Sequence, residues 1–146
     1  MVKGLHHYSR TVSNIDVSKE FFQKYFGFKE KLRRDNVDAA YVGKILNISG
    51  LRLHMLFMEG HGIVVEFFEF LNPKGEKLDC RTPNTGSTHL CFLVEDLHSM
   101  YEEMKRDGVK MISEEPIAID QGNHAGGYSL YLLDPDDSVI ELIQLP

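Results

Sequence analysis

Two stretches of the chain show the same succession of hydrophobic and polar positions. Each begins with a run rich in aromatic, β-branched and other apolar residues, passes through a capping residue, Asn14 or Asp96, and continues with apolar positions at helical spacing. Gly27 and Gly108 then follow where a left-handed helix stop is expected. Each stretch therefore predicts a strand followed by a helix, the first about 11 residues long.

Short strand-like runs follow each predicted helix. They cover residues 28–34, 39–47, 51–58 and 62–71 in the first stretch, and residues 109–113, 128–133 and 138–144 in the second. Turn-forming residues at 60–62 and 134–137 separate the last two runs of each stretch. Each stretch thus reads approximately as βαβββ, and the fold class is α+β.

The two stretches also share a His and a Glu at matching places. His7 and His89 lie 82 residues apart, each followed by Val at the fifth position after it. Glu66 and Glu141 lie 75 residues apart, each inside an apolar run. A modest difference in loop length accounts for the two offsets. We therefore predict a single domain over residues 1–146, built from two modules at about 2–75 and 84–146.

Composition and charge exclude several classes of protein. A chain of 146 residues with 42% hydrophobic content can bury a core without a disulfide framework, and its two cysteines match no such framework or zinc-finger spacing. The net charge of −6 and the scattered basic residues argue against a nucleic-acid partner. The first residues lack the apolar segment of a signal peptide, and no run is long enough to span a bilayer. We expect a cytoplasmic protein with no membrane partner.

Glu66 and Glu141 each lie in a run that is apolar on both faces. Such strands are normally buried on both faces, where an isolated charge is costly. His7 and His89, each opening a strand of the same module, add two imidazoles. One such His or Glu alone is more often structural, but both recur at equivalent positions. We therefore expect one divalent metal ion, Zn, Ni, Co, Fe or Mn, bound by all four residues.

With these features the sequence resembles the vicinal oxygen chelate (VOC) superfamily, which includes glyoxalase I, methylmalonyl-CoA epimerase, extradiol dioxygenases and the fosfomycin and bleomycin resistance proteins. The resemblance covers essentially the whole chain. It implies a glyoxalase-like fold in which two βαβββ modules form a cup-shaped mixed sheet around one metal, usually within a homodimer. It rests on the two His-opened strands, the Val-Glu strand, and the segments Tyr25-Phe26-Gly27-Phe28, Thr88-His89-Leu90, Asp134-Pro135-Asp136 and Ile140-Glu141-Leu142.

A ligand set of two His and two Glu looks most like glyoxalase I or the epimerase. The resemblance implies a metal-dependent lyase or isomerase that transfers a proton on a chelated small carbonyl compound or thioester. Glu141 is the expected base, and Glu66 its partner on the opposite face. The alternatives are an epimerase of the methylmalonyl-CoA type, a non-catalytic small-molecule-binding protein of the resistance type and, less favoured, an extradiol dioxygenase.

Four further residues are expected to contact the small-molecule substrate. Bacterial glyoxalases carry Arg four residues after the first ligand His and Asn four residues after the first Glu, where this chain has Thr11 and Phe70. The resemblance therefore does not extend to glutathione binding. Cys91 shares the strand face of His89. His124 lies in a glycine-rich loop, residues 120–127, which suits either a mobile lid or a long hairpin connection.

Overall fold

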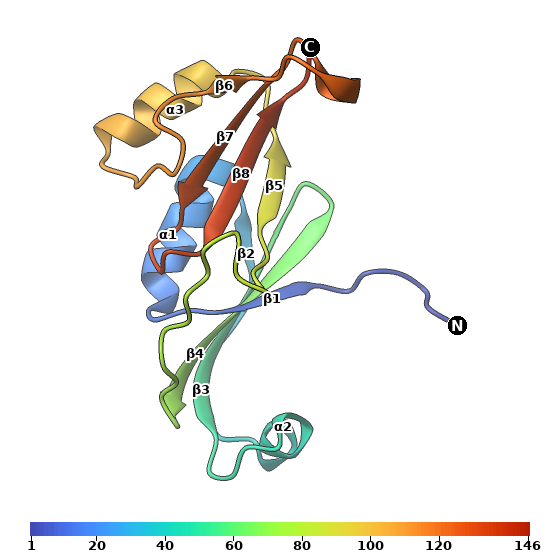
Figure 1. Ribbon diagram of the computed structural model, residues 1–146. Helices are drawn as coiled ribbons and strands as arrows, with labels where there is room; N and C mark the ends of the chain where they lie inside the picture. The colour runs from blue at the N-terminus through green and yellow to red at the C-terminus, as the bar shows by residue number, and fades with distance from the viewer. The chain divides into compact units, whose positions relative to one another are not determined.

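The computed structural model describes every residue from Met1 to Pro146. The chain divides into two compact units, Met1–Lys77 (unit 1) and Leu78–Pro146 (unit 2). Each unit contains its own four-stranded sheet, and Figure 1 labels the elements of both. None of the helices has the length and apolar character needed to cross a membrane.

Unit 1 is built on a mixed sheet with strand order β1-β4-β3-β2. Strand β1 is parallel to β4, whereas β3 is antiparallel to both β4 and β2. Helix α1 packs on this sheet through Phe22, whose ring lies 5.0 Å, centroid to centroid, from that of Phe67 in β4. The elements are β1 (Tyr8–Thr11), α1 (Ile15–Phe26), β2 (Lys29–Val37), α2 (Ala40–Leu46), β3 (Arg52–Gly60) and β4 (Ile63–Asn72).

Unit 2 repeats this plan with strand order β5-β8-β7-β6. Strand β5 is parallel to β8, and β7 is antiparallel to both β8 and β6. The elements are β5 (Leu90–Leu93), α3 (Leu97–Arg106), β6 (Ile117–Ala118), a 3₁₀ turn (Gly122–His124), β7 (Tyr128–Leu133) and β8 (Val139–Gln144). The predicted α+β fold of two βαβββ modules is confirmed, with α2 as an addition to the first.

The two units share strand register as well as element order. Ser9, two residues after His7, lies opposite Glu66, and Cys91, two residues after His89, lies opposite Glu141. The parallel pairing continues beyond the strands in the same way, because the backbone amides at positions 12 and 94 each donate a hydrogen bond of 2.8 Å to the last strand of their unit. The sequence repeat is therefore a repeat of backbone geometry.

The N-termini of α1 and α3 are also held alike. In α1, Asn14 accepts hydrogen bonds from the amides two and three residues later, and the amide of Ile15 donates to Glu69 Oε2 in β4 at 2.9 Å. In α3, the amide of Leu97 donates to Gln144 Oε1 in β8 at 2.8 Å. A side chain of the last strand thus fixes the start of the helix in each unit.

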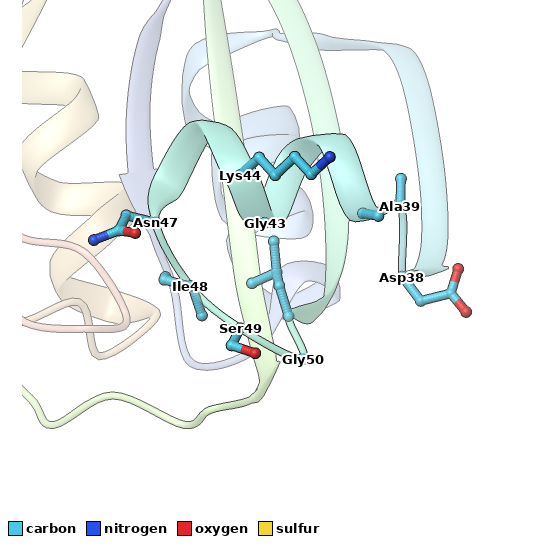
Figure 2. Close-up of a pocket in the computed structure, with 10 residues that line it drawn as sticks. Asp38, Ala39, Gly43, Lys44, Asn47, Ile48, Ser49 and Gly50 are labelled. Carbon is cyan, nitrogen blue, oxygen red and sulfur yellow. The ribbon is translucent and has the colours of Figure 1, made fainter.

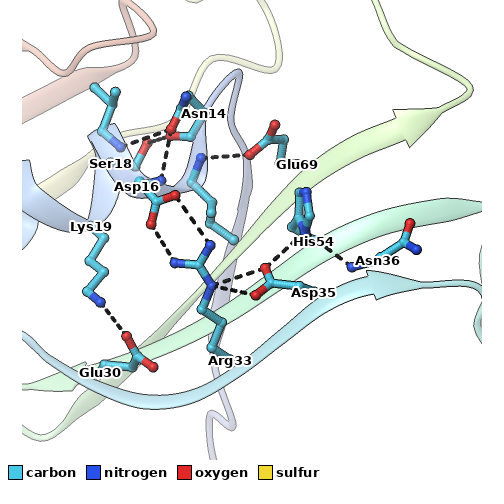
Figure 3. Close-up of polar contacts among 12 residues, drawn as sticks. Asn14, Asp16, Ser18, Lys19, Glu30, Arg33, Asp35, Asn36, His54 and Glu69 are labelled. Atoms are coloured by element: carbon cyan, nitrogen blue, oxygen red, sulfur yellow. Dashed lines mark hydrogen bonds and ion pairs between the residues drawn. The ribbon is translucent and has the colours of Figure 1, made fainter.

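Arg33 links β2 to α1 on the helix-covered side of the unit 1 sheet (Figure 3). Its guanidinium binds the carboxylate of Asp16 in α1 and also that of Asp35, at 3.0 Å. The hydrogen bond from Arg33 holds the pKa of Asp16 below its ordinary value. Asp35 in turn lies 2.9 Å from Nδ1 of His54 in β3. These contacts connect three elements of unit 1 at its surface.

The expected strand at 39–47 is wrong, because residues Ala40–Leu46 form helix α2. Tyr41 and Ile45, four residues apart, lie on its exposed side, and Asn47 ends the helix in the left-handed conformation at φ 55°. Gly43 faces inward, where a Cβ would lie 2.7 Å from the carbonyl oxygen of Ile48. A run this short has no periodicity that distinguishes a helix from a strand.

The expected strand at 109–113 is also wrong. This segment forms one isolated bridge, between Met111 and Leu132 of β7. The short edge strand β6 lies further along the chain, at Ile117–Ala118, and pairs with the start of β7. Met111 and Ile112 gave the apolar signal, but only one position of the segment has a bridge partner.

Candidate metal centre

His7 and Glu66 form a pair in unit 1. His7 immediately precedes β1, and its Nε2 lies 3.3 Å from Glu66 Oε2 in β4. Glu66 is only 6% exposed, as the apolar run predicted. The Nδ1 atom of His7 lies 2.7 Å from Nδ1 of His6, and Phe57 of β3 packs edge-on against the His7 ring. The imidazole is therefore oriented with Nε2 toward the carboxylate.

His89 and Glu141 form the matching pair in unit 2. His89 immediately precedes β5, and its Nε2 lies 3.2 Å from Glu141 Oε2 in β8. The other carboxylate oxygen, Oε1, accepts a hydrogen bond of 2.9 Å from Ser129 Oγ in β7. Tyr131, directly opposite Glu141 in β7, places its ring 5.4 Å from that of His89. The second pair therefore lies among polar groups.

Cys91 and Tyr131, two neighbours of the Glu141 carboxylate, both have raised pKa values. Burial raises the pKa of the Cys91 thiol to about 11, and the charge of Glu141 adds to this. Burial, with a hydrogen bond to Glu141, raises the pKa of Tyr131 to about 12. Near neutral pH, Cys91 is therefore a neutral thiol and Tyr131 a neutral phenol. A thiolate nucleophile at Cys91 is disfavoured.

The two pairs fit a divalent cation in chemistry and in spacing. Imidazole nitrogen and carboxylate oxygen are ordinary ligands of Zn²⁺ and similar ions, at bond lengths of about 2.0–2.2 Å. Two donors on one tetrahedral ion are then about 3.3 Å apart, close to the observed 3.3 and 3.2 Å. No group of three or more His, Cys, Asp or Glu side chains that could hold a metal is formed. Each unit therefore contains one such pair.

The expected substrate contacts divide between the units. Thr11 ends β1 opposite Phe68, and Phe70 lies two residues further along β4, so both share the sheet face of Glu66. Cys91 lies opposite Glu141. His124 ends the exposed 3₁₀ turn and makes no hydrogen bond or ring contact with the second pair. Three of the four residues thus share a face with a His–Glu pair.

Sequence reasoning missed several neighbours of the pairs. The strand register places Phe57 opposite Glu66 and Tyr131 opposite Glu141. Ser129, two residues before Tyr131, lies on the same face of β7. The available signal was the hairpin between β7 and β8, which closes with Leu133 opposite Val139. Counting back from that closure places every second residue of β7 on the face of Glu141.

A separate cavity of about 430 Å³ lies in unit 1 between α2 and the loop that follows it (Figure 2). Asp38, Lys44, Asn47 and Ser49 provide its polar side chains, and Ile48 and Leu51 are among its apolar ones. It contains neither His nor Cys and only one carboxylate. Its lining therefore lacks the donor set found at the two pairs.

Each unit is thus a βαβββ module that carries one His–Glu pair in the same register. The family model of the Glyoxalase/Bleomycin resistance protein/Dioxygenase superfamily matches residues 4–142. The chain belongs to this superfamily, which confirms the resemblance to the vicinal oxygen chelate group.

Two curated relatives extend over almost the whole chain. A 2-epi-5-epi-valiolone epimerase from Actinomyces sp is 29% identical over 98% of this chain and 80% of its own length. Glyoxylase I 4 from Arabidopsis thaliana is 31% identical over 95% of this chain and 69% of its own length. Their names describe two different activities within one superfamily.

Two solved structures share the fold. A glyoxalase family protein from Bacillus cereus superposes with a TM-score of 0.81 at 19% identity, over 99% of this chain and 95% of that one. The fosfomycin resistance protein FosX from Listeria monocytogenes, solved with Mn(II) and a sulfate ion, gives a TM-score of 0.67 at 20% identity, over 100% of this chain and 95% of that one. At these identities the similarity concerns the fold alone.

Proposed function

We propose that this protein is a divalent-metal-dependent lyase or isomerase of the glyoxalase I type. It transfers a proton on a small carbonyl compound or thioester that carries a neighbouring oxygen. The observation that carries the proposal is the duplicated pair, an imidazole nitrogen 3.2–3.3 Å from a carboxylate oxygen in the same register of both units. Coincidence is a poor explanation for four such residues.

His7, Glu66, His89 and Glu141 would hold one ion, with the two pairs supplied by one chain or by the two chains of a homodimer. The ion would withdraw electrons from the substrate oxygens and so acidify the C–H bond between them. One of the two carboxylates, Glu141 or Glu66, accepts the proton and returns it. The fosfomycin resistance protein solved with Mn(II) supports a divalent metal in this fold.

The residues on the pair-bearing faces suit a substrate of modest polarity. Thr11 offers a hydroxyl, Phe70 an apolar surface and Cys91 a neutral thiol. His124, on its exposed turn, would reach the substrate only from the loop. Thr11, Phe70 and Cys91 have no cationic form, so they supply no positive partner for the carboxylates of glutathione.

An epimerase is the second candidate, favoured by the 29% identity to an epimerase over 98% of the chain. Epimerisation needs a proton acceptor on one face of the carbon and a donor on the other. Under this proposal Glu141 and Glu66 would be the two groups. A non-catalytic binding protein is less well supported, because both His–Glu pairs are complete.

Metal binding of the purified protein provides the first test. We expect the wild-type protein, dialysed against Co²⁺, Mn²⁺, Ni²⁺ or Zn²⁺, to retain one ion per four-residue site. His7→Ala should lose most of this metal, whereas His98→Ala, on the exposed side of α3, should not. A wild-type protein that retains none of these ions would eliminate the enzyme proposal.

Hydrogen exchange in D₂O then separates the two activities. The panel contains α-hydroxy ketones, thioesters and the hemithioacetals that α-oxo aldehydes form with thiols. A glyoxalase converts a hemithioacetal into the isomeric α-hydroxyacyl thioester, whereas an epimerase incorporates deuterium without net conversion to another compound. Proton NMR records both outcomes in one sample. Exchange and conversion that are absent with every compound, in protein shown to contain metal, would favour the non-catalytic binding protein.

A further inference from the structure

His6 and His7 are adjacent in sequence, and their side chains are in contact just before β1. Nδ1 of His6 lies 2.7 Å from Nδ1 of His7, and the ring centroids are 5.0 Å apart with an angle of 79° between the ring planes. Neighbouring side chains of a regular strand point to opposite faces of its sheet. The contact therefore depends on an irregular backbone at these two residues, and β1 begins only at Tyr8.

A hydrogen bond between two Nδ1 atoms needs one proton between them. A neutral imidazole has one nitrogen that donates and one that accepts. Nε2 of His7 lies 3.3 Å from Glu66 Oε2, and an ionised carboxylate can only accept. In the metal-free protein Nε2 of His7 therefore carries the proton of that ring. Nδ1 of His7 is then an acceptor, and Nδ1 of His6 is the donor.

A His7 ring that ligates an ion through Nε2 must have the opposite arrangement. Its Nε2 offers a lone pair, so its proton is on Nδ1, and Nδ1 of His6 becomes the acceptor. The proton of His6 is then on Nε2, where the exposed ring is open to water. Each ring has one proton in both arrangements. One proton leaves Nε2 of His7 for water, one crosses the Nδ1–Nδ1 contact, and one joins Nε2 of His6 from water.

Contacts at both ring nitrogens distinguish His7 from its equivalent in unit 2. His7 contacts Glu66 through Nε2 and His6 through Nδ1, so rotation of the ring would break both contacts at once. His89 has a hydrogen-bond contact through Nε2 and none through Nδ1. Thr88 stands in the place of His6. Only the imidazole of unit 1 is therefore held by side chains at both nitrogens.

We propose that His6 is a positioning residue that holds the ring of His7 through Nδ1 and so keeps Nε2 of His7 in the orientation that binds the ion. This rests on the proposed function. A partner on the second nitrogen of a ligating histidine orients the ring and strengthens metal binding by about 10- to 100-fold. A carbonyl or carboxylate partner could only accept, whereas His6 can donate or accept and so keeps its contact with and without the ion.

The proton positions in the metal-free protein test this contact without any ion. Long-range proton–nitrogen correlation NMR of protein labelled with nitrogen-15 histidine identifies which nitrogen of each ring carries the proton. We expect the proton on Nδ1 in His6 and on Nε2 in His7. Protons on Nε2 of both rings, or on Nδ1 of both, would overturn the proposal, because no hydrogen bond could then join the two Nδ1 atoms.

Binding of Co²⁺ alone measures what the contact contributes to the site. We expect His6→Leu, whose side chain neither donates nor accepts, to weaken Co²⁺ binding about 10-fold. His6→Asn supplies an amide that can donate or accept and should bind within about 3-fold of wild type. His98→Leu, the same change at an exposed histidine of α3, should bind as wild type does. The visible bands of bound Co²⁺ and the urea midpoint of the metal-free protein show whether each variant retains its site and its fold.

The Co²⁺ results separate this proposal from the proposed function. Wild-type protein that binds no Co²⁺ contradicts the proposed function, and the role of His6 falls with it. Wild-type protein that binds Co²⁺, with His6→Leu binding equally well, contradicts only the role of His6. Equal losses in His6→Leu and His6→Asn would show that the site needs the imidazole of His6 itself, as a ligand would be needed, and would overturn the positioning role.

Discussion

Glu69 is expected to control how firmly α1 is attached to its sheet, and the cost of removing it follows from the contacts at the start of the helix. The amide of Ile15 donates to Glu69 Oε2 at 2.9 Å, and Ile15 is only 1% exposed, so water has little access to replace the carboxylate. Leaving a buried amide unpaired costs about 1–3 kcal/mol. Loss of a negative charge at a helix N-terminus adds about 0.3–1 kcal/mol. Glu69→Met should therefore destabilise the protein by about 2 kcal/mol.

Unit 2 supplies the matched control. Gln144 accepts from the amide of Leu97 at 2.8 Å in the equivalent place, which shows that a neutral amide oxygen can serve as the acceptor. Glu69→Gln should thus lose only the contribution of the charge, about 0.5 kcal/mol. Gln144→Met should cost about 1–2 kcal/mol, because it removes the acceptor without removing a charge.

Urea unfolding followed by circular dichroism in the far ultraviolet measures these differences. The expected order of destabilisation is Glu69→Met, then Gln144→Met, then Glu69→Gln. A Glu69→Gln variant as unstable as Glu69→Met would show that the charge, rather than the hydrogen bond, holds the helix. A Glu69→Met variant within about 0.5 kcal/mol of wild type, the range typical of surface substitutions, would refute the hydrogen-bond assignment itself.

Other contacts lead to three further predictions. Because Arg33 lowers the pKa of Asp16 in the folded state, their pairing stabilises the fold above the ordinary aspartate pKa, and this stabilisation is lost as the pH falls through the lowered value. The urea midpoints of wild type and Arg33→Met should therefore differ near neutral pH and converge in acid. A difference that stays constant with pH would contradict this. Gly127→Ala would place a Cβ well inside contact distance of the backbone carbonyl oxygen of Gln144 in β8. We expect the free energy of unfolding, measured by heat or urea, to fall by about 1–3 kcal/mol. An unchanged stability would show that the turn can shift. Iodoacetamide should label Cys91 slowly near neutral pH, with a rate that rises toward a pH of about 11 and a midpoint that moves down in Glu141→Gln. A midpoint at the ordinary thiol pKa would contradict the raised pKa of Cys91.

The sequence predicted the fold wherever the two modules repeat one another. The strand–helix start, the Gly27 stop at φ 63° and the paired strands that carry Glu66 and Glu141 are all present. The errors lie where the modules differ, at residues 39–47 and 109–113. Residues 39–47 have no equivalent in the other module, whereas residues 109–113 occupy the place of the long strand β2 but form only one bridge. Short apolar runs are ambiguous by themselves.

The candidate site shows the same dependence on repetition. His7, Glu66, His89 and Glu141 were identifiable because each has an equivalent in the other module. Ser129 and Tyr131 were not, because the matching positions hold Met55 and Phe57, so the comparison of modules gave no signal there. Their proximity to Glu141 depends on the register of the β7–β8 hairpin, which the local sequence specifies only once the closing pair of the turn is known.

The differences between the modules are therefore as informative as the repeat. The backbone supplies an identical frame, with Ser9 opposite Glu66 and Cys91 opposite Glu141. A hydroxyl at Ser129, with none at Met55, makes the two carboxylates inequivalent within that frame. Substitutions that exchange side chains between equivalent positions therefore probe function more directly than deletion of either pair, because they leave all four proposed ligands in place.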